Sequence, residues 1–332
     1  MRYFITGATG FIGGAVTRQL IGAGHEVSAL VRSRQRAGDL TRLGVELHEG
    51  DLLEPSSLRR PMEGADGVFH LAAWYKIGVR EPAAARINVD GTRAVLETMR
   101  EQGIAKGVYT STVGVFGDTR GRLVDETYRS DGPFLTEYDR TKWQAHYEVA
   151  LPMAEAGLPL VIVMPGAVYG PGDTSQVGAS LAALLRGRFP MAPAQTTFSW
   201  GYIDDVAHGI VRAMERGRIA QSYLLTGPCH TFEAFMDEAA SLAGVPAPRL
   251  HPGPRVMRVL AAGCAALERV GVRPPYSPES LRLMAGTTWI GSHEKASREL
   301  GFEPRPIAAG LALTLASLAA RAPRAESRNQ NQ

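Results

Sequence analysis

The feature that most constrains the fold is a glycine-rich turn, TGATGFIG, at residues 6–13. It follows a short apolar run at 3–5 and precedes a segment with helical spacing at 15–21. In that context, the three glycines permit a tight turn, a close approach of a pyrophosphate, and close packing of helix on strand. The alternative is a glycine-rich turn without a ligand. We expect a dinucleotide to contact Gly7, Thr9, Gly10, Phe11 and Ile12.

Apolar runs alternate with helical patterns through the first half of the chain. The run at 160–165 is almost wholly apolar, as expected of a strand buried on both faces of a parallel sheet. This alternation predicts an α/β fold, a Rossmann doubly wound parallel sheet. The other expected strands lie at 26–32, 45–52, 67–73, 106–112 and 222–225.

The 332 residues exceed the usual size of one domain, so we expect a second, smaller and mostly helical substrate lobe. The pattern changes after residue 165. We therefore assign 1–165 to a nucleotide-binding domain, with 201–226 returning to it, and 166–200 and 227–320 to the lobe. The polar tail, 321–332, is expected to be disordered.

Charge and cysteine content exclude several classes of protein. A net charge of +3 with dispersed arginines gives no basis for binding nucleic acid. Cys229 and Cys264 have no metal-ligand spacing and form no disulfide framework, so we expect no metal, a reducing cytoplasm, and two small buried side chains.

Membrane insertion is not expected. The first strand begins at residue 3, which leaves no room for a signal peptide before it. The longest apolar stretches, 259–267 and 307–320, are shorter than the roughly 20 residues of a spanning helix. Both are interpreted as buried or docking helices.

The end of the second strand indicates which cofactor binds. Strands of this kind that bind NAD often end in an acidic residue, whereas here Arg32 stands at that position, followed by Arg34 and Arg36. A guanidinium suits a 2′-phosphate, which favours NADPH or NADP+ over NAD. The alternative is a solvated basic loop.

Further cofactor contacts are expected where other strands end. Small residues after the fourth strand let a cofactor lie against the backbone. Asp51 and Leu52 are placed beside the adenine, although Asp51 alternatively caps the helix near Pro55. The remaining expected contacts are Leu71, Ala72, Ala73, Thr110, Pro165, Ala167 and Val168.

A tyrosine and a lysine share one helix face close to a strand that ends in hydroxyl groups. Tyr138 and Lys142 are four residues apart in a helix that Thr136 or Glu137 begins. The preceding strand ends in Thr110, Ser111 and Thr112. The alternative is a surface tyrosine beside a surface lysine.

Together these motifs resemble the extended short-chain dehydrogenases/reductases of the NAD-dependent epimerase/dehydratase superfamily. Within that family the chain looks most like the dihydroflavonol-reductase-like branch, a layout shared by bacterial hopanoid-associated sugar epimerases, whose name need not describe their chemistry. The matching segments are TGATGFIG at 6–13, HLAA at 70–73, NVDGT at 88–92, YTSTVGVFG at 109–117, YDRTK at 138–142, PGAVYGPGD at 165–173, YIDDVA at 202–207 and HEKASRELGFEP at 293–304.

The resemblance implies a catalytic role for each of five residues. Tyr138 is the general acid in reduction and the base in oxidation. Lys142 lowers the pKa of that tyrosine, which is ordinarily near 10, and holds the nicotinamide ribose. Thr112 binds the substrate carbonyl, and Ser111 supports the loop or takes its place. Asn88 holds a proton-relay water, although asparagine within a helix more often caps locally or faces solvent.

Three residues depart from the family pattern. Thr112 stands where serine is usual and carries the same donor and acceptor. Met164 replaces an arginine, which weakens a sugar-nucleotide interpretation, and Thr141 replaces a serine before the lysine.

The expected substrate wall is mostly aromatic and uncharged, which favours an apolar or aromatic carbonyl. Each aromatic residue could equally belong to the core between the lobes. The wall residues are Trp74, Tyr75, Thr112, Val113, Val168, Tyr169 and Tyr202.

The leading hypothesis is an NADPH-dependent reductase of ketones or aldehydes that acts reversibly on a small molecule. The alternatives are an NAD-dependent nucleotide-sugar epimerase or dehydratase, a 3-beta-hydroxysteroid-dehydrogenase-like enzyme, and a redox-sensing binding protein without catalysis. The resemblance also implies a homodimer through the helix bearing Tyr138 and the long helix before it.

Overall fold

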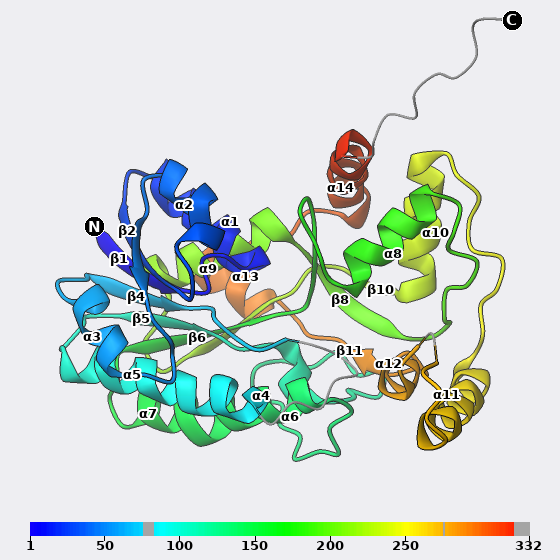
Figure 1. Cartoon of the computed structure of the whole chain (residues 1–332), viewed down its shortest axis with the longest axis horizontal. Helices are drawn as coiled ribbons and strands as arrows, with labels where there is room; N and C mark the ends of the chain where they lie inside the picture. Colours follow the sequence, from blue (N-terminus) through cyan, green and yellow to red (C-terminus); the bar gives the residue numbers. More distant parts are fainter. Residues whose placement is uncertain (76–82, 275, 322–332) are drawn as a thin grey trace, which may run out of the picture.

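The computed structural model describes residues 1–75, 83–274 and 276–321. Its main feature is a seven-stranded sheet in the order β3-β2-β1-β4-β5-β6-β9, with every neighbouring pair parallel (Figure 1). The predicted doubly wound parallel sheet is confirmed. The strands are β1 Arg2–Thr6, β2 Glu26–Val31, β3 Glu46–Glu49, β4 Gly67–His70, β5 Gly107–Thr110, β6 Leu160–Pro165 and β9 Ser222–Leu225.

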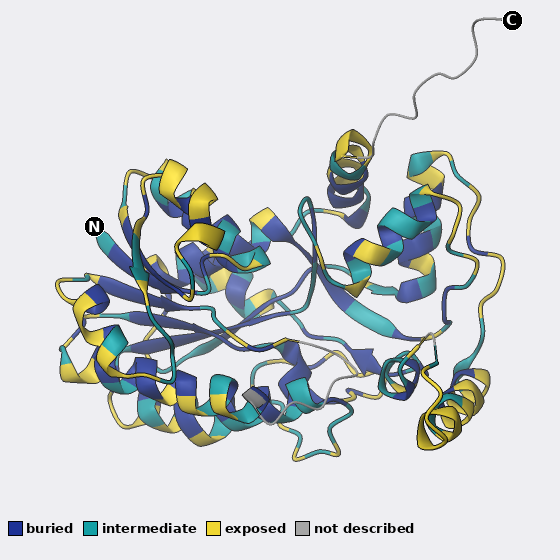
Figure 2. Cartoon of the chain, viewed as in Figure 1, coloured by how far each residue is buried: buried dark blue, intermediate teal, exposed yellow. Residues whose placement is uncertain are grey.

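Helices cover both faces of this sheet, so its central strands are buried along almost their whole length (Figures 1 and 2). Every residue of β6 is buried. On one face lie α1 Phe11–Gly22, α2 Gly38–Arg42, α9 Ile203–Arg216 and α13 Glu294–Leu300. On the other lie α3 Ser56–Met62, α5 Gly91–Glu101, α6 Glu137–Gln144 and α7 Leu151–Glu155.

Two of the longer helical runs contain a π-helical segment. Arg86–Asp90 joins α4, Ala83–Ala85, to α5, and Ala145–Ala150 joins α6 to α7. Such wider turns often occur at functional sites because they redirect a side chain within a continuous helix. The first of them carries Asn88.

A second, four-stranded sheet lies beyond β6, in the region expected to be mostly helical. It consists of β7 Ala167–Tyr169, β8 Thr197–Tyr202, β10 Cys229–Thr231 and β11 Thr288–Trp289. Around it lie α8 Gln176–Leu185, α10 Phe232–Ala243, α11 Pro254–Arg269, α12 Pro278–Leu283 and α14 Ile307–Arg321. The boundaries drawn between the two lobes stay a prediction.

Three expectations concern single segments of this region. Cys229 is exposed on the edge strand β10, so the prediction that it is buried was wrong; its Sγ lies 3.2 Å from Ser199 Oγ. Among the described helices, none is long and apolar enough to cross a membrane. The tail from 322 onward lies outside the described residues.

An aromatic cluster forms the core where the two sheets meet. Trp200 of β8 stacks on Phe235 of α10, with ring centroids 3.8 Å apart and planes 5° from parallel. Tyr169 packs edge-on against both rings and against Tyr202. The structure therefore places Tyr169 and Tyr202 in the core, which is the alternative interpretation given for them above.

We expect Phe235→Ala to lower the free energy of unfolding by about 3–5 kcal/mol, because it removes a buried ring and leaves a cavity beside Trp200. Urea denaturation measures the change. Leu242→Ala on the same helix is the control, since Leu242 is 47% exposed and should change stability by less than about 0.5 kcal/mol. Equal effects would contradict this account of the core.

Candidate active site

The carboxyl ends of β1, β4 and β5 meet at one edge of the main sheet. Thr6 pairs with His70, and His70 pairs with Tyr109, so the segments that follow these residues lie side by side. This edge is where open α/β sheets bind their ligands. It therefore gathers the glycine turn, the small residues after β4 and the hydroxyl residues after β5.

The glycine turn is shaped by close backbone contacts. Gly7 has a φ of +80°, and a Cβ placed there would lie 2.6 Å from the backbone nitrogen of Ala72. A Cβ on Gly13 would lie 2.0 Å from the Gly7 carbonyl oxygen, so α1 packs directly on the turn. Both positions exclude any larger residue.

The amino terminus of α1 is open to a ligand. Thr9 and Gly10 are exposed, and the helix begins after Gly10 without a side-chain cap. Uncapped N–H groups and the positive end of a helix dipole form an anion-binding site. This geometry fits the diphosphate of a dinucleotide.

His70 links the start of the glycine turn to helix α5 through two buried hydrogen bonds. Its Nδ1 lies 2.7 Å from Thr6 Oγ1, and its Nε2 lies 2.9 Å from Thr92 Oγ1 on α5. Burial, reinforced by the nearby Lys142 ammonium, lowers the pKa of His70 to about 3. The imidazole is therefore neutral and serves as a fixed hydrogen-bonding bridge.

Lys142 is the central cation of the site and is almost wholly buried. Its Nζ donates to Tyr109 Oη at 2.9 Å and to the Thr110 carbonyl oxygen at 2.8 Å. It also lies 4.5 Å from the centre of the Tyr109 ring. Burial lowers the pKa of Lys142 to about 7. Tyr109, which was not among the predicted site residues, thus fixes the position of the lysine.

Tyr138 lies one turn before Lys142 and is half-buried. Its ring packs edge-on against Tyr75, with centroids 4.8 Å apart. Burial, followed by Tyr75 and Asp139, raises the pKa of Tyr138 above its ordinary value, while a hydrogen bond with Thr112 opposes the shift. Lys142 is not among the causes of this shift, because its ammonium hydrogen-bonds Tyr109 and Thr110 here; the expected lowering of the Tyr138 pKa by Lys142 stays a prediction.

The two candidate hydroxyls have different surroundings. Thr112 Oγ1 accepts from the Gly114 amide at 3.1 Å and hydrogen-bonds Tyr138. Ser111 Oγ instead lies 2.8 Å from Nδ1 of the buried His146. Thr112 therefore faces the tyrosine, whereas Ser111 anchors its strand end to the π-helical segment of the α6–α7 run.

Asn88 is buried and does not face solvent. Its Oδ1 accepts from the Trp74 amide at 2.7 Å, and its Nδ2 donates to the Trp74 carbonyl at 3.1 Å and to Thr141 Oγ1 at 2.9 Å. Both amide hydrogens are thus engaged by protein. Asn88 positions the segment after β4 against the helix that carries Tyr138 and Lys142, while the relay water stays a prediction.

Asp139 is a buried carboxyl group that the sequence reasoning did not single out. Burial raises its pKa to about 7, and Glu279 of α12 adds to that shift, although a hydrogen bond from Thr136 opposes it. A Cβ on Gly114 would lie 2.5 Å from Asp139 Oδ1, so glycine there makes room for the carboxyl. The buried position of the residue after Tyr138 could not be read from helical spacing alone.

The predicted aromatic wall divides into exposed and buried members. Tyr75 is 51% exposed and lies against Tyr138, whereas Trp74 is buried behind it. Val113 is also buried, at the start of a short 3-10 helix. Tyr75 is thus the exposed one among the aromatic members of the set, while Thr112 and Val168 are partly buried.

The basic residue after β2 lines a surface cavity of about 310 Å³. Arg32 is exposed there, but Glu49, Asp51 and Glu54 line the same cavity. Asp51 Oδ1 accepts from the Leu53 amide at 2.9 Å, and so it stabilises a local turn rather than capping α3. The cavity expected to hold the adenosine end of the cofactor is therefore lined by one cation and three carboxylates.

An unpartnered hydroxyl group marks where a cofactor fits. The Thr110 hydroxyl is buried at the end of β5 and has no hydrogen-bond partner within the described chain, as expected of a group that meets a ligand.

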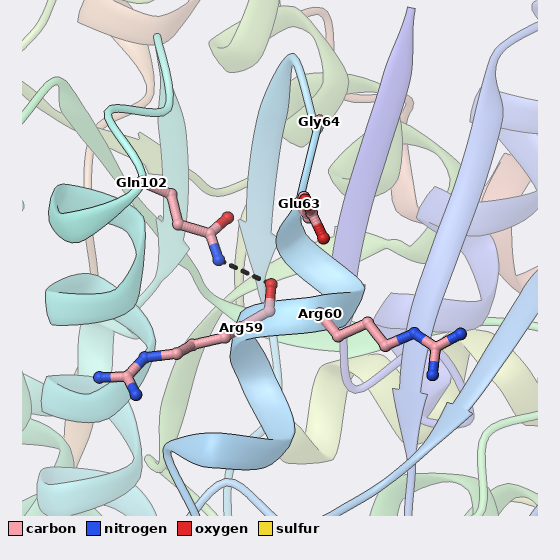
Figure 3. Close-up of a pocket in the computed structure, with 5 residues that line it drawn as sticks. All are labelled: Arg59, Arg60, Glu63, Gly64 and Gln102. Atoms are coloured by element: carbon pink, nitrogen blue, oxygen red, sulfur yellow. Dashed lines mark hydrogen bonds between the residues drawn. The ribbon is translucent and has the colours of Figure 1, made fainter.

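A larger cavity, about 520 Å³, lies away from this edge and is lined by Arg59, Arg60, Glu63, Gly64 and Gln102 (Figure 3). It lies where α3 and α5 end, at the opposite edge of the sheet from the glycine turn.

Comparison with known sequences agrees with this geometry. Residues 3–225 match the NAD dependent epimerase/dehydratase family. Sterol demethylase protein B of Methylococcus capsulatus is 32% identical over 94% of this chain and 96% of its own. A Synechocystis protein bearing the name of a dihydroflavonol 4-reductase is 32% identical over 93% of this chain and 92% of its own. A farnesyl-dihydroquinoline-oxide ketoreductase of Stigmatella aurantiaca is 30% identical over 92% of each chain.

Among solved structures, that of gox2253 has a TM-score of 0.84 and 31% identity, and covers 96% of this chain and 98% of its own. The family match and the reductase-named relatives define an NAD(P)-dependent oxidoreductase of the extended short-chain type. The chain belongs to the NAD-dependent epimerase/dehydratase family, and its dihydroflavonol-reductase-like relatives confirm the predicted resemblance.

The buried lysine predicts a dependence of stability on pH. Lys142 has a folded-state pKa of about 7 against an ordinary 10.5, so between those values the unfolded chain binds the extra proton and stability rises with pH. Lys142→Met should remove up to about 1.4 kcal/mol per pH unit from that slope. Urea denaturation between pH 7 and 9 measures it, and an unchanged slope would show that Lys142 titrates normally.

Proposed function

We propose that this chain is an NADPH-dependent reductase that converts a ketone or aldehyde to an alcohol, reversibly, with Tyr138 as the general acid. The observation that carries the proposal is the cluster of Tyr138, Thr112 and Lys142 at the sheet edge beside the open glycine turn. The enzyme is expected to work in the cytoplasm, and a homodimer remains a family expectation.

The cofactor would lie along the carboxyl edge of the sheet. Its diphosphate would meet the uncapped start of α1, and its adenosine end would reach Arg32. Lys142 uses two of its three ammonium hydrogens within the described protein, which leaves one for a ribose hydroxyl. The Thr110 hydroxyl would gain its missing partner there. When bound, the nicotinamide supplies the hydride.

The chain's own residues would control the proton. Burial keeps the Tyr138 phenol protonated, which suits a group that gives its proton to the oxygen of a carbonyl as that oxygen gains charge. Thr112 would donate a hydrogen bond to the same oxygen and orient the substrate. In the oxidative direction the phenolate would be needed, and a cofactor contact that draws Lys142 toward Tyr138 would favour it.

The substrate is proposed to be an apolar or aromatic carbonyl compound. Tyr75 presents an exposed ring beside Tyr138, and the neighbouring residues of the wall are uncharged. The names of two relatives, a sterol demethylase protein and a ketoreductase of a farnesylated quinoline oxide, refer to compounds of this kind.

A second candidate is an NAD-dependent epimerase or dehydratase of nucleotide-sugars, which uses the same tyrosine and lysine. The three carboxylates beside Arg32 favour it, because they repel a 2′-phosphate and suit ribose hydroxyls. A 3-beta-hydroxysteroid-dehydrogenase-like activity is a variant of the leading proposal with a sterol as the alcohol.

The first test is titration of the purified protein with NADPH and NADH, followed by turnover on a panel of carbonyl compounds at 340 nm. We expect tighter NADPH binding, and Arg32→Asp should reverse the preference because it removes the cation that faces the 2′-phosphate. Arg100→Asp, an exposed change on α5, is the control. Tightly held NAD without net turnover would instead indicate the epimerase.

Tyr138→Phe should reduce turnover by about 10²–10⁴-fold, because the ring keeps its packing on Tyr75 but has no proton to give. Steady-state kinetics and cofactor titration are the measurements, and cofactor affinity should stay within a few-fold of the native value. Retained turnover would rule out the assigned role.

Thr112→Val and Ser111→Ala separate the two hydroxyls. The first should lower kcat by about 10²–10³-fold, since it removes the donor to the carbonyl oxygen. The second should leave kcat within a few-fold but lower the free energy of unfolding by about 1–3 kcal/mol, since it leaves the buried His146 without its partner. The reverse pattern of kcat would assign catalysis to Ser111.

A further inference from the structure

The helix α11 is far more exposed than its sequence suggests. Its apolar stretch at 259–267 was expected to be buried or docked, yet most of the helix lies open at the outer end of the second lobe (Figure 2). Val259 is 71% exposed, and Val270, just beyond the helix, is 74% exposed. Such a run of exposed apolar residues on a folded protein marks a surface that binds something.

A small cluster anchors the opposite face of the helix. Met257 and Ala261 are buried against Leu281 and Ala285, which lie on and just after α12. Cys264, one turn further along, is partly buried in the same cluster. The helix is thus fixed along one side and presents the other side outward.

The outward side has an apolar strip. Its members recur at the three-, four- and seven-residue spacings that place side chains on one face of a helix. All are more than two-fifths exposed, and the apolar surface continues past the end of the helix through Val270 and Val272. The strip consists of Val256, Val259, Leu260 and Leu267.

A basic strip runs beside the apolar one. Arg255, Arg258 and Arg269 are exposed, and spacings of three and eleven residues place them along one side of the helix. The acidic residue of the helix, Glu268, is also exposed, but it is separated by four and seven residues from Cys264 and Ala261 and so lies on the side of the helix nearer the anchored face. The helix therefore combines exposed valine and leucine with three arginines against one glutamate, an excess of positive charge.

We propose that α11 binds this enzyme to the surface of an anionic lipid bilayer, with its apolar strip in the interface and its arginines on the lipid phosphates. An amphipathic helix with a basic flank lies in the plane of a membrane and binds through apolar burial plus attraction to anionic headgroups. Its 16 residues are too few to span the bilayer.

A second copy of the chain fits this face less well. A two-fold interface apposes the same patch from both protomers, so two arginine strips would face one another without carboxylates between them. Apart from Tyr276, which is exposed beyond the helix, the surface also lacks the aromatic anchors that are enriched in protein interfaces. The excess of positive charge favours a negatively charged planar partner.

The location of α11 gives the proposal a functional consequence. Its neighbour α12 carries Glu279, whose charge acts on Asp139 of α6, the helix that also carries Tyr138. Membrane binding through α11 would therefore hold the substrate side of the enzyme near the bilayer, where apolar carbonyl compounds concentrate. The binding itself does not depend on which substrate the enzyme takes.

The test is co-sedimentation of the full chain with vesicles of phosphatidylcholine alone or with phosphatidylglycerol added, at low and high salt. We expect binding to the anionic vesicles that weakens with salt. Val259→Asp and the triple change Arg255→Glu, Arg258→Glu, Arg269→Glu should each reduce the bound fraction at least ten-fold. The charge-matched control is Arg60→Glu, Arg93→Glu, Arg100→Glu on α3 and α5, which should bind as the native chain does.

Three outcomes would overturn the proposal. They are no binding of the native chain to either vesicle, equal loss of binding in the control triple, and a concentration-dependent dimer that Val259→Asp dissociates. The last would show that the face is an interface between copies. Cofactor binding, measured on every variant, reports folding and keeps a failure of this proposal distinct from a failure of the proposed reductase.

Discussion

The site depends on a lysine ammonium held in the protein interior. Lys142 is 2% exposed, and desolvating such a charge is unfavourable unless hydrogen bonds replace water. Tyr109 and the Thr110 carbonyl supply those bonds, and both belong to the end of β5. The position of α6, which carries Tyr138 and Lys142, is thus tied to the sheet by a polar interaction rather than by apolar packing alone.

That interaction belongs to a larger buried polar network. Tyr109 stacks on His70, which hydrogen-bonds the end of β1 and α5, while Asn88 fastens the segment after β4 to Thr141. Its members come from several segments of the chain, so the glycine turn, the loop after β4 and α6 hold one relative position. Networks of this kind specify one arrangement when all their groups are satisfied.

Much of the fold could be predicted from sequence because strand and helix patterns are local. β6 and β9 begin and end where the apolar runs do, and Thr136 caps the catalytic helix as its side chain predicts. The partners of Lys142 could not be predicted, because Tyr109 is 33 residues away and meets it only where α6 lies against the end of β5 in the folded chain. The contact of His146 with Ser111 could not be predicted for the same reason. The exposure of α11 could not be predicted either, because periodicity identifies an apolar helix face but not whether another element covers it.

The position of β9 has a consequence for synthesis of the chain. β6 is complete at residue 165 and pairs on one side with β5, which precedes it. Its neighbour on the other side, β9, begins only at Ser222, after β7 and β8 have been made. Until then β6 presents an unpaired, wholly apolar edge of the kind that pairs with other chains. Folding on the ribosome must therefore protect that edge while more than fifty further residues emerge, and aggregation of nascent chains should begin there.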